Sequence, residues 1–204
     1  GPRGARLGLV PQAGGRRVAG RGGWSRETLG GRPGLHGHQG PAGGGFRAGD
    51  KSQVSAALLE GLRAEGISVA AANYRLTNTA PYPAQMHDAA RALQFIRLHA
   101  REYNIDPSRV GATGGSAGAG ISEWLAFHED LADPQAADPV LQQSTRITCA
   151  GVTAAQTSYD PRFHMKLFQT YDIESAIFLL FDMSAPEDAH NPKNFPLFED
   201  ASPI

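Results

Sequence analysis

The sequence predicts an α/β fold built on a mainly parallel β-sheet. Two observations support this prediction. Short apolar runs bounded by turn-forming residues alternate with segments whose apolar residues recur at helical spacing, and the order strand, helix, strand, helix, strand follows from them. The length of 204 residues allows one sizeable domain and argues against two full ones.

The first half of the pattern runs from residue 53 to residue 104. A helix is expected over 53–64, where Val54, Leu58 and Leu62 form an apolar stripe and Gly66 supplies a stop. Residues 67–73 form a short apolar run between turn formers, which is typical of a buried strand. A longer helix is expected over 82–104, with Pro83 in its first turn.

The second half begins where Asp106-Pro-Ser breaks the chain. Residues 109–113 are the next strand candidate, and the small residues 114–120 lead into a helix that ends near His128. Residues 147–154 are expected to form another buried strand. Together these elements place a glycine-rich turn between a strand and a helix.

The N-terminal segment has a different composition from the rest. Residues 1–45 contain seven arginines, one glutamate and sixteen of the 25 glycines, and no apolar period of a strand or helix. Such a stretch buries too little apolar surface to offset its ordering entropy. We therefore expect residues 1–42 to lie outside the fold and a partial domain to occupy residues 43–204. A basic tail that touches nucleic acid or an acidic partner is the alternative.

Composition excludes several functional classes. The formal net charge of −1 gives no chain-wide basic field for nucleic acid. The longest apolar runs, 67–72 and 176–181, are far shorter than the ~20 residues of a membrane span, and no secretory signal is evident, so a cytoplasmic location is the default. The single cysteine, Cys149, excludes an internal disulfide framework and a cysteine-cluster metal site.

The glycine-rich turn at 110–120 fits two motifs. The glycines at 114, 118 and 120 after Thr113 resemble the pyrophosphate-binding turn of short-chain dehydrogenases, whereas Gly114-x-Ser116-x-Gly118 is the nucleophile elbow of α/β-hydrolases. The dehydrogenase interpretation requires a Tyr-x-x-x-Lys pair. Tyr103, Tyr159 and Tyr171 are not followed by lysine at that spacing, which favours the elbow.

Blocks on both sides of the elbow resemble one esterase family in order and spacing. These blocks are Gly43-Gly-Gly-Phe-Arg-Ala-Gly-Asp50, Tyr74-Arg-Leu76, Pro81-Tyr-Pro-Ala84, Asp106-Pro-Ser-Arg-Val110 and Gly114-Gly-Ser-Ala-Gly118. The chain thus resembles α/β-hydrolase carboxylesterases and lipases related to hormone-sensitive lipase. The resemblance implies hydrolysis of a small-molecule carboxylic ester through an acyl-serine, without metal or organic cofactor.

The resemblance also assigns site residues. Ser116 is the implied nucleophile, and the backbone N–H groups of Gly44, Gly45 and Ala117 are the implied oxyanion hole. The family places a histidine before the glycines, where this chain has Ala42, with His36 and His38 just upstream. This departure is a further reason to expect that residues 1–42 are foreign to the fold.

The base and acid of the triad are the second departure. The family order is Ser, acid, His, and the resemblance puts both partners beyond Ile204, so we expect them to be absent and turnover to be impaired. Within the chain, Asp160 with His190, or His164, are the remaining candidates. The alternatives are a non-catalytic remnant and a peptidase of the prolyl-oligopeptidase type. The aromatic stretch 156–200 is a possible cap-like insertion.

Overall fold

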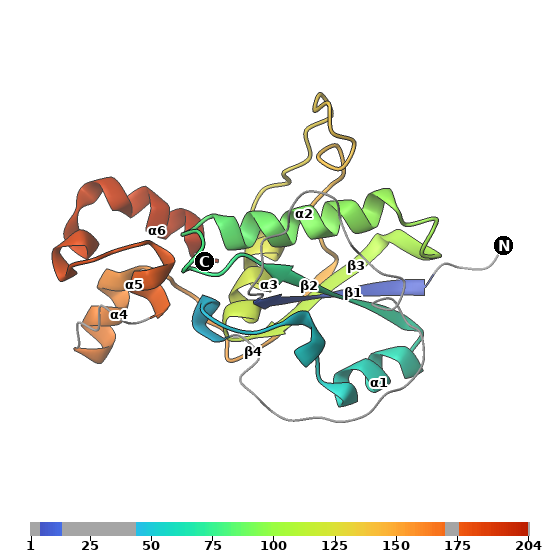
Figure 1. Cartoon of the computed structure of the whole chain (residues 1–204), viewed down its shortest axis with the longest axis horizontal. Helices are drawn as coiled ribbons and strands as arrows, with labels where there is room; N and C mark the ends of the chain where they lie inside the picture. The colour runs from blue at the N-terminus through green and yellow to red at the C-terminus, as the bar shows by residue number, and fades with distance from the viewer. Residues whose placement is uncertain (1–4, 14–43, 170–175, 204) are drawn as a thin grey trace.

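The protein is built on a four-stranded parallel sheet with the strand order β2-β1-β3-β4. The computed structural model describes residues 5–13, 44–169 and 176–203. The strands are β1 (Ala5–Ala13), β2 (Ile67–Tyr74), β3 (Ile105–Gly115) and β4 (Cys149–Thr153). The predicted α/β fold with a parallel sheet is therefore confirmed (Figure 1).

Strand β1 corrects the expectation that all of residues 1–42 lie outside the fold. Its backbone pairs with β2 from Arg6 to Ala13 and with β3 up to Leu9, so it fills the position between these two strands. The side-chain pattern of this segment carries no strand signal. Its place depends instead on backbone pairing with strands far away in the sequence. Residues 1–4 and 14–42 lie outside the described residues.

Three helices connect and cover the strands. They are α1 (Ala56–Ala64), α2 (Ala84–Leu98) and α3 (Ala117–Phe127). Helices α2 and α3 pack against each other on one side of the sheet, and α1 lies on the other side (Figure 1). Met86, Leu93 and Ile96 of α2 and Ile121 of α3 are almost fully buried between helices and sheet.

Two element boundaries differ from the sequence predictions for local reasons. The first helix begins at Ala56 rather than near 53, because Asp50 caps a separate turn, η3 (Lys51–Gln53), and Ser55 then caps α1. Helix α2 ends at Leu98, and the chain reaches β3 through turns.

Strand β4 also corrects a prediction. The sequence predicts a buried strand over 147–154, but every residue of β4 is exposed except the half-buried Val152. In the sheet of the described residues β4 is an edge strand, paired on one side with β3. Beside it lies a cavity of about 480 Å³ between α1 and the sheet, lined by residues that include Leu58, Ile67 and Cys149.

The residues after β4 form a helical lobe at one end of the molecule (Figure 1). It contains α4 (Pro161–Phe168), α5 (Ala176–Leu180), the short turns η4 (Pro186–His190) and η5 (Pro192–Asn194), and α6 (Phe195–Ala201). Tyr82 N–H donates to the Leu180 carbonyl at 2.7 Å, and the indole N–H of Trp124 donates to the Asp200 carbonyl at 3.0 Å. These contacts attach the lobe to the α2–α3 side of the sheet.

Candidate active site

Ser116 lies at a sharp bend between the end of β3 and the start of α3. Its backbone angles are φ 51° and ψ −119°, a left-handed φ that non-glycine residues rarely adopt. Such a conformation costs on the order of 1–3 kcal/mol and persists only where the surroundings impose it. Ser116 is half-buried rather than packed in the core.

Backbone contacts on both sides hold this bend. The Ser116 N–H donates to the Thr153 carbonyl at the end of β4, at 3.0 Å, and the Ser116 carbonyl accepts from the Gly120 N–H, also at 3.0 Å. A Cβ on Gly114 would lie 2.5 Å from the carbonyl carbon of Gly118. The strand and the helix therefore approach too closely for a side chain at residue 114, which explains the glycine at this position of the motif.

The second predicted segment forms η2 (Gly44–Phe46), which lies against α3. Gly45 has φ 55° and ψ 35°, and a Cβ there would lie 2.9 Å from Cβ of Ala176 in α5. Phe46 is buried, and its carbonyl accepts the Thr77 N–H at 3.0 Å. The glycine loop is thus held in place by the buried Phe46 and by the close approach of α5 to Gly45.

Ala117 is the first residue of α3. The first N–H groups of a helix have no acceptor within the helix, and the helix dipole adds partial positive charge at this end. An anion next to Ser116 would therefore lie close to the N–H of Ala117. Ser116 and Ala117 lie at the start of α3. The turn η2, which contains Gly44 and Gly45, contacts the same helix.

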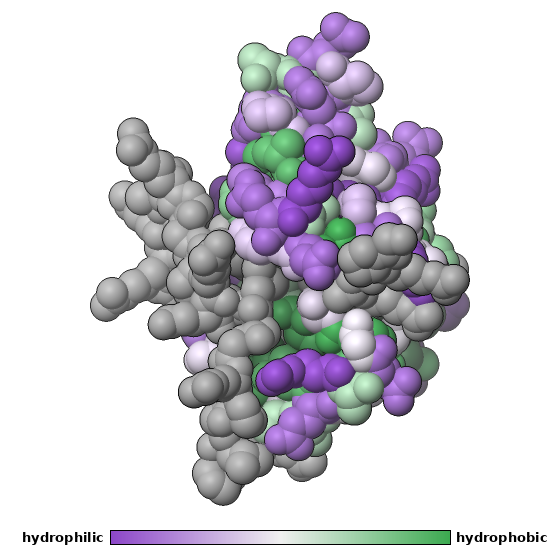
Figure 2. Space-filling view, turned by 90° about the vertical axis from the view of Figure 1, so that its right-hand side faces the viewer, coloured by the Kyte–Doolittle hydropathy of each residue, from purple (hydrophilic) through white to green (hydrophobic). Residues whose placement is uncertain are grey.

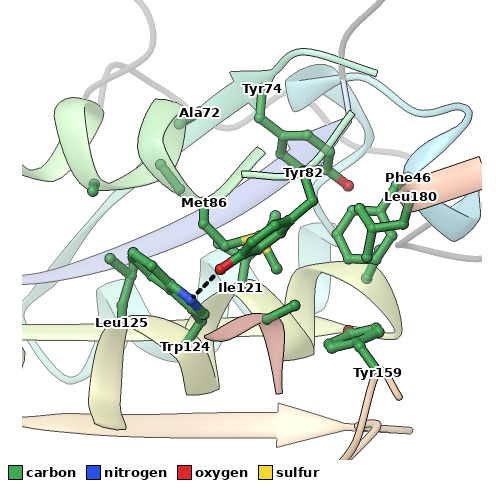
Figure 3. Close-up of a cluster of buried hydrophobic side chains, with 14 of the residues drawn as sticks. Phe46, Ala72, Tyr74, Tyr82, Met86, Ile121, Trp124, Leu125, Tyr159 and Leu180 are labelled. Atoms are coloured by element: carbon green, nitrogen blue, oxygen red, sulfur yellow. Dashed lines mark hydrogen bonds between the residues drawn. The ribbon is translucent and has the colours of Figure 1, made fainter. Parts of the chain in front are cut away.

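Tyr159 supports both halves of the site from behind, a role that sequence reasoning missed. Its ring meets the Phe46 ring edge-on with centroids 5.8 Å apart (Figure 3). On the other side, a Cβ on Gly120 would lie 1.8 Å from the Tyr159 hydroxyl oxygen. Gly120 lies outside the G-x-S-x-G pentapeptide, and its lack of a side chain was the available signal that something approaches α3 there.

The two tyrosine hydroxyls behind the site, those of Tyr74 and Tyr159, stay uncharged over a wide pH range. Burial raises the pKa of the Tyr159 hydroxyl, and the nearby Glu123 and Tyr74 raise it further. Burial also raises the pKa of Tyr74 and of Glu123. The Tyr74 hydroxyl and one carboxyl oxygen of Glu123 are buried without a hydrogen-bond partner in the described part of the chain. The support is therefore mainly apolar and steric.

The candidate triad partners lie elsewhere. Asp160 binds the guanidinium of Arg162 and caps α4, the His164 ring nitrogen Nε2 contacts the Ser158 carbonyl at 2.8 Å, and His190 is exposed at the end of η4. Among the described residues, no histidine is hydrogen-bonded to Ser116. The structure thus gives Asp160 a structural role and does not bring His164 or His190 into contact with the serine.

In the ranges 5–13, 44–169 and 176–203, no group of three or more His, Cys, Asp or Glu side chains could hold a metal ion. No helix in these ranges is long and apolar enough to span a membrane.

Comparison with known proteins identifies relatives of this chain. Over 108 residues it is 32% identical to a probable carboxylic ester hydrolase, LipM, of Mycobacterium tuberculosis, covering 53% of this chain and 25% of LipM. It is 38% identical over 87 residues to the carboxylesterase NlhH of the same species, covering 41% of this chain and 26% of NlhH. The match to arylacetamide deacetylase of Bos taurus is 33% over 96 residues, or 45% of this chain and 24% of that protein. The chain thus spans about a quarter of each of these relatives.

Solved structures support the fold. An acetyl ester-xyloside bifunctional hydrolase from Caldicellulosiruptor lactoaceticus superposes with a TM-score of 0.63 at 20% identity, covering 98% of this chain and 57% of that one. A truncated carbohydrate esterase from gut microbiota gives a TM-score of 0.64 at 18% identity, covering 98% and 61%. The BD-FAE family model matches residues 42–163, which include the glycine loop, the elbow and Tyr159. The chain therefore belongs to the BD-FAE family of esterase-type α/β-hydrolases.

Proposed function

We propose that this chain carries the nucleophile and oxyanion-binding half of a carboxylic ester hydrolase. The observation that supports this most directly is the φ of 51° at Ser116, because a serine held in this conformation between a parallel strand and a helix presents its hydroxyl at the top of the sheet. The esterase relatives and the family match point to the same reaction class.

In the proposed reaction, Ser116 Oγ attacks the carbonyl carbon of the ester. A C–O bond to Ser116 forms, and the serine proton passes to a general base. The carbonyl oxygen becomes an oxyanion held by the N–H groups of Gly44, Gly45 and Ala117. The bond to the alcohol oxygen then breaks, the alcohol leaves with the proton, and water hydrolyses the acyl-serine.

The described residues do not supply a general base to Ser116. Without a partner histidine, a serine nucleophile retains only the catalysis that binding and oxyanion stabilisation provide. We therefore expect slow acylation of this chain and low turnover of short p-nitrophenyl esters. A dipeptide anilide, with its poorer leaving group, should not be cleaved.

Labelling by a fluorophosphonate probe tests the nucleophile. The folded chain should be modified slowly on the peptide containing Ser116, as read by mass spectrometry, and Ser116→Ala should remove the label. Ser108→Ala is the matched control, because Ser108 is an exposed serine on β3, the strand that leads to Ser116. A label on another residue, or none on a chain that circular dichroism shows to be folded, would identify a non-catalytic remnant and reject the proposal.

A further inference from the structure

The chain that follows the glycine loop is tied to the end of strand β2 and the turn after it at two points. At the first point, the Thr77 N–H donates to the Phe46 carbonyl at 3.0 Å. At the second point, further along the chain, the side chain of Asn73 binds both Asp50 and Lys51. Asn73 lies near the end of β2 and is half-buried. We call the bonds at this second point the Asn73 clamp.

The amide of Asn73 is used on both of its sides. Its Nδ2 donates to Asp50 Oδ2 at 3.0 Å, and its Oδ1 accepts the Lys51 N–H at 2.6 Å. An ionised carboxylate can only accept and a backbone N–H can only donate, so the two partners allow one orientation of the amide. The clamp therefore requires a donor and an acceptor at fixed places on one short side chain.

The carboxylate of Asp50 is the other half of the clamp. Its Oδ1 accepts the Ser52 N–H at 2.9 Å and the Ser52 hydroxyl at 2.7 Å, which leaves Oδ2 to face Asn73. The hydrogen bonds from Ser52 and from Asn73 lower the pKa of Asp50, and the charge of Lys51 lowers it further. Asp50 is thus ionised at neutral pH, and a hydrogen bond to an ionised acceptor is stronger than one between neutral groups.

Two ties fix the orientation of the glycine loop as well as its position. The buried ring of Phe46 and its one backbone bond hold the loop at a single residue, which could act as a pivot. The clamp holds the same segment a second time at residues 50–51 and prevents rotation about Phe46. Gly44 and Gly45, the proposed oxyanion donors, directly precede or follow this pivot within η2, so their N–H directions depend on it.

We propose that Asn73 and Asp50 are positioning residues of the esterase site, which orient the glycine loop through the clamp and thereby set the rate of acylation of Ser116. This inference rests on the proposed function of the chain. Neither residue is assigned a contact with substrate. Their effect passes through the backbone N–H groups of the loop, and a misplacement of about 1 Å at such a group can cost about 10²-fold in rate.

Exchange of the two side chains tests the clamp. Asn73→Asp places two carboxylates against each other, and Asp50→Asn places two amide donors against each other. Each single variant should therefore react with the fluorophosphonate probe at Ser116 about tenfold more slowly than the parent chain. The double variant Asp50→Asn, Asn73→Asp restores a donor facing an acceptor with the roles exchanged, and its labelling rate should return to within about twofold of the parent rate.

The pH dependence distinguishes positioning from a merely structural role. Two adjacent carboxylates share one proton as the pH falls, which restores a hydrogen bond between them. The labelling rate of Asn73→Asp, divided by that of the parent chain, should therefore rise from about pH 8 to about pH 5. The same ratio for Asn73→Ala, which has no titrating group in the clamp, should stay constant.

Asp106→Ala is the matched control. Like Asp50, Asp106 accepts the N–H and the hydroxyl of the serine two residues further on, here Ser108, at 2.9 and 2.6 Å. It lies near the start of β3, at the opposite end of this strand from Ser116. That end of the molecule carries hydrophilic residues interspersed with hydrophobic ones (Figure 2). Asp106→Ala should be labelled within about twofold of the parent rate, because it removes a turn and leaves the clamp intact.

The outcomes separate this proposal from the proposed function. A parent chain that carries no label on Ser116 would reject the esterase function itself. A labelled parent chain whose single variants react at the parent rate, or whose double variant reacts no faster than the singles, would overturn the clamp alone. Circular dichroism checks each variant, and single variants that lose their fold where the double variant keeps it would make the pair structural and also overturn the proposal.

Discussion

At the scale of single residues, the site depends on close approaches that only glycine permits. Gly45 has a φ of 55°, and a Cβ added to it would lie 2.9 Å from Cβ of Ala176. Gly45 is one of the proposed oxyanion donors, and complete loss of such a donor costs about 10²–10³ in rate. We therefore expect Gly45→Ala to slow fluorophosphonate labelling of Ser116 about tenfold or more.

Ala176→Gly offers a matched rescue of this variant. It removes the methyl group that the new Cβ would meet but leaves the left-handed φ unrelieved. The double variant should therefore recover part of the labelling rate. Full recovery would mean that the left-handed backbone at Gly45 is unimportant, and no recovery would mean that contact with α5 is not what positions the loop.

Gly120 and Gly61 give a matched pair of helix glycines. Gly120→Ala should lower the free energy of unfolding by about 1–3 kcal/mol, because its Cβ would overlap the buried Tyr159 hydroxyl. Gly61→Ala in α1 has nothing within 4 Å of the added Cβ, so it should raise that free energy by about 0.5–1 kcal/mol. Urea unfolding measures both, and similar effects of the two variants would contradict the packing assigned to Tyr159.

At the scale of elements, Asp160 determines how α4 begins. Its carboxylate accepts the Arg162 N–H at 2.8 Å and binds the Arg162 guanidinium. Burial alone would raise the pKa of Asp160, but the hydrogen bonds from Arg162 lower it overall. The ionised form is thus favoured in the folded state, and its stabilisation is complete above the unfolded pKa of about 3.9 and is lost as the pH falls through the folded value.

We expect Asp160→Ala to lower the free energy of unfolding by about 1 kcal/mol at neutral pH, the usual effect of losing a helix cap. The difference from the parent chain should shrink as the pH falls below about 4. Asp160→Asn keeps a capping oxygen but has no titrating group. It should therefore lose less stability than Asp160→Ala, and its stability should lack this part of the pH dependence. Thermal unfolding from pH 7 to pH 3 measures the effect, and a difference independent of pH would argue against the ionised cap.

At the scale of the whole molecule, the sheet depends on β1. Leu9 is paired with Ala70 of β2 and with Ala112 of β3. Leu9→Pro removes a backbone donor between two strands, and we expect a loss of about 3 kcal/mol or more, or no folded protein. The native Pro11 lies beyond the last residue that pairs with β3, where a proline is tolerated. Slow amide hydrogen exchange at Leu7–Leu9 would support this place in the sheet, and rapid exchange with an intact fold would exclude it.

The sequence predicted those parts of the molecule that local patterns determine. The helices α1, α2 and α3 and the strands β2 and β3 follow from apolar periodicity and from Gly, Pro and Asp at their ends. The bend at Ser116 follows from the steric need for glycine at 114, which is a property of a few adjacent residues.

What could not be predicted depends on contacts between distant segments. The position of β1 is fixed by pairing with β2 and β3, and its own residues carry no alternating pattern. The exposure of β4 reflects its place at the edge of the sheet rather than its composition. The support of the site by Tyr159 likewise arises only when the chain returns to α3 after β4.

The edge strand β4 has a practical consequence. Cys149 is the single cysteine of the chain, it is exposed, and it is paired with Gly111 of the strand that leads to Ser116. Four residues later, the carbonyl of Thr153 holds the Ser116 N–H. A thiol-directed dye or spin label would therefore attach at one known point, on the strand whose far end anchors the bend, and could report in real time when an inhibitor occupies Ser116.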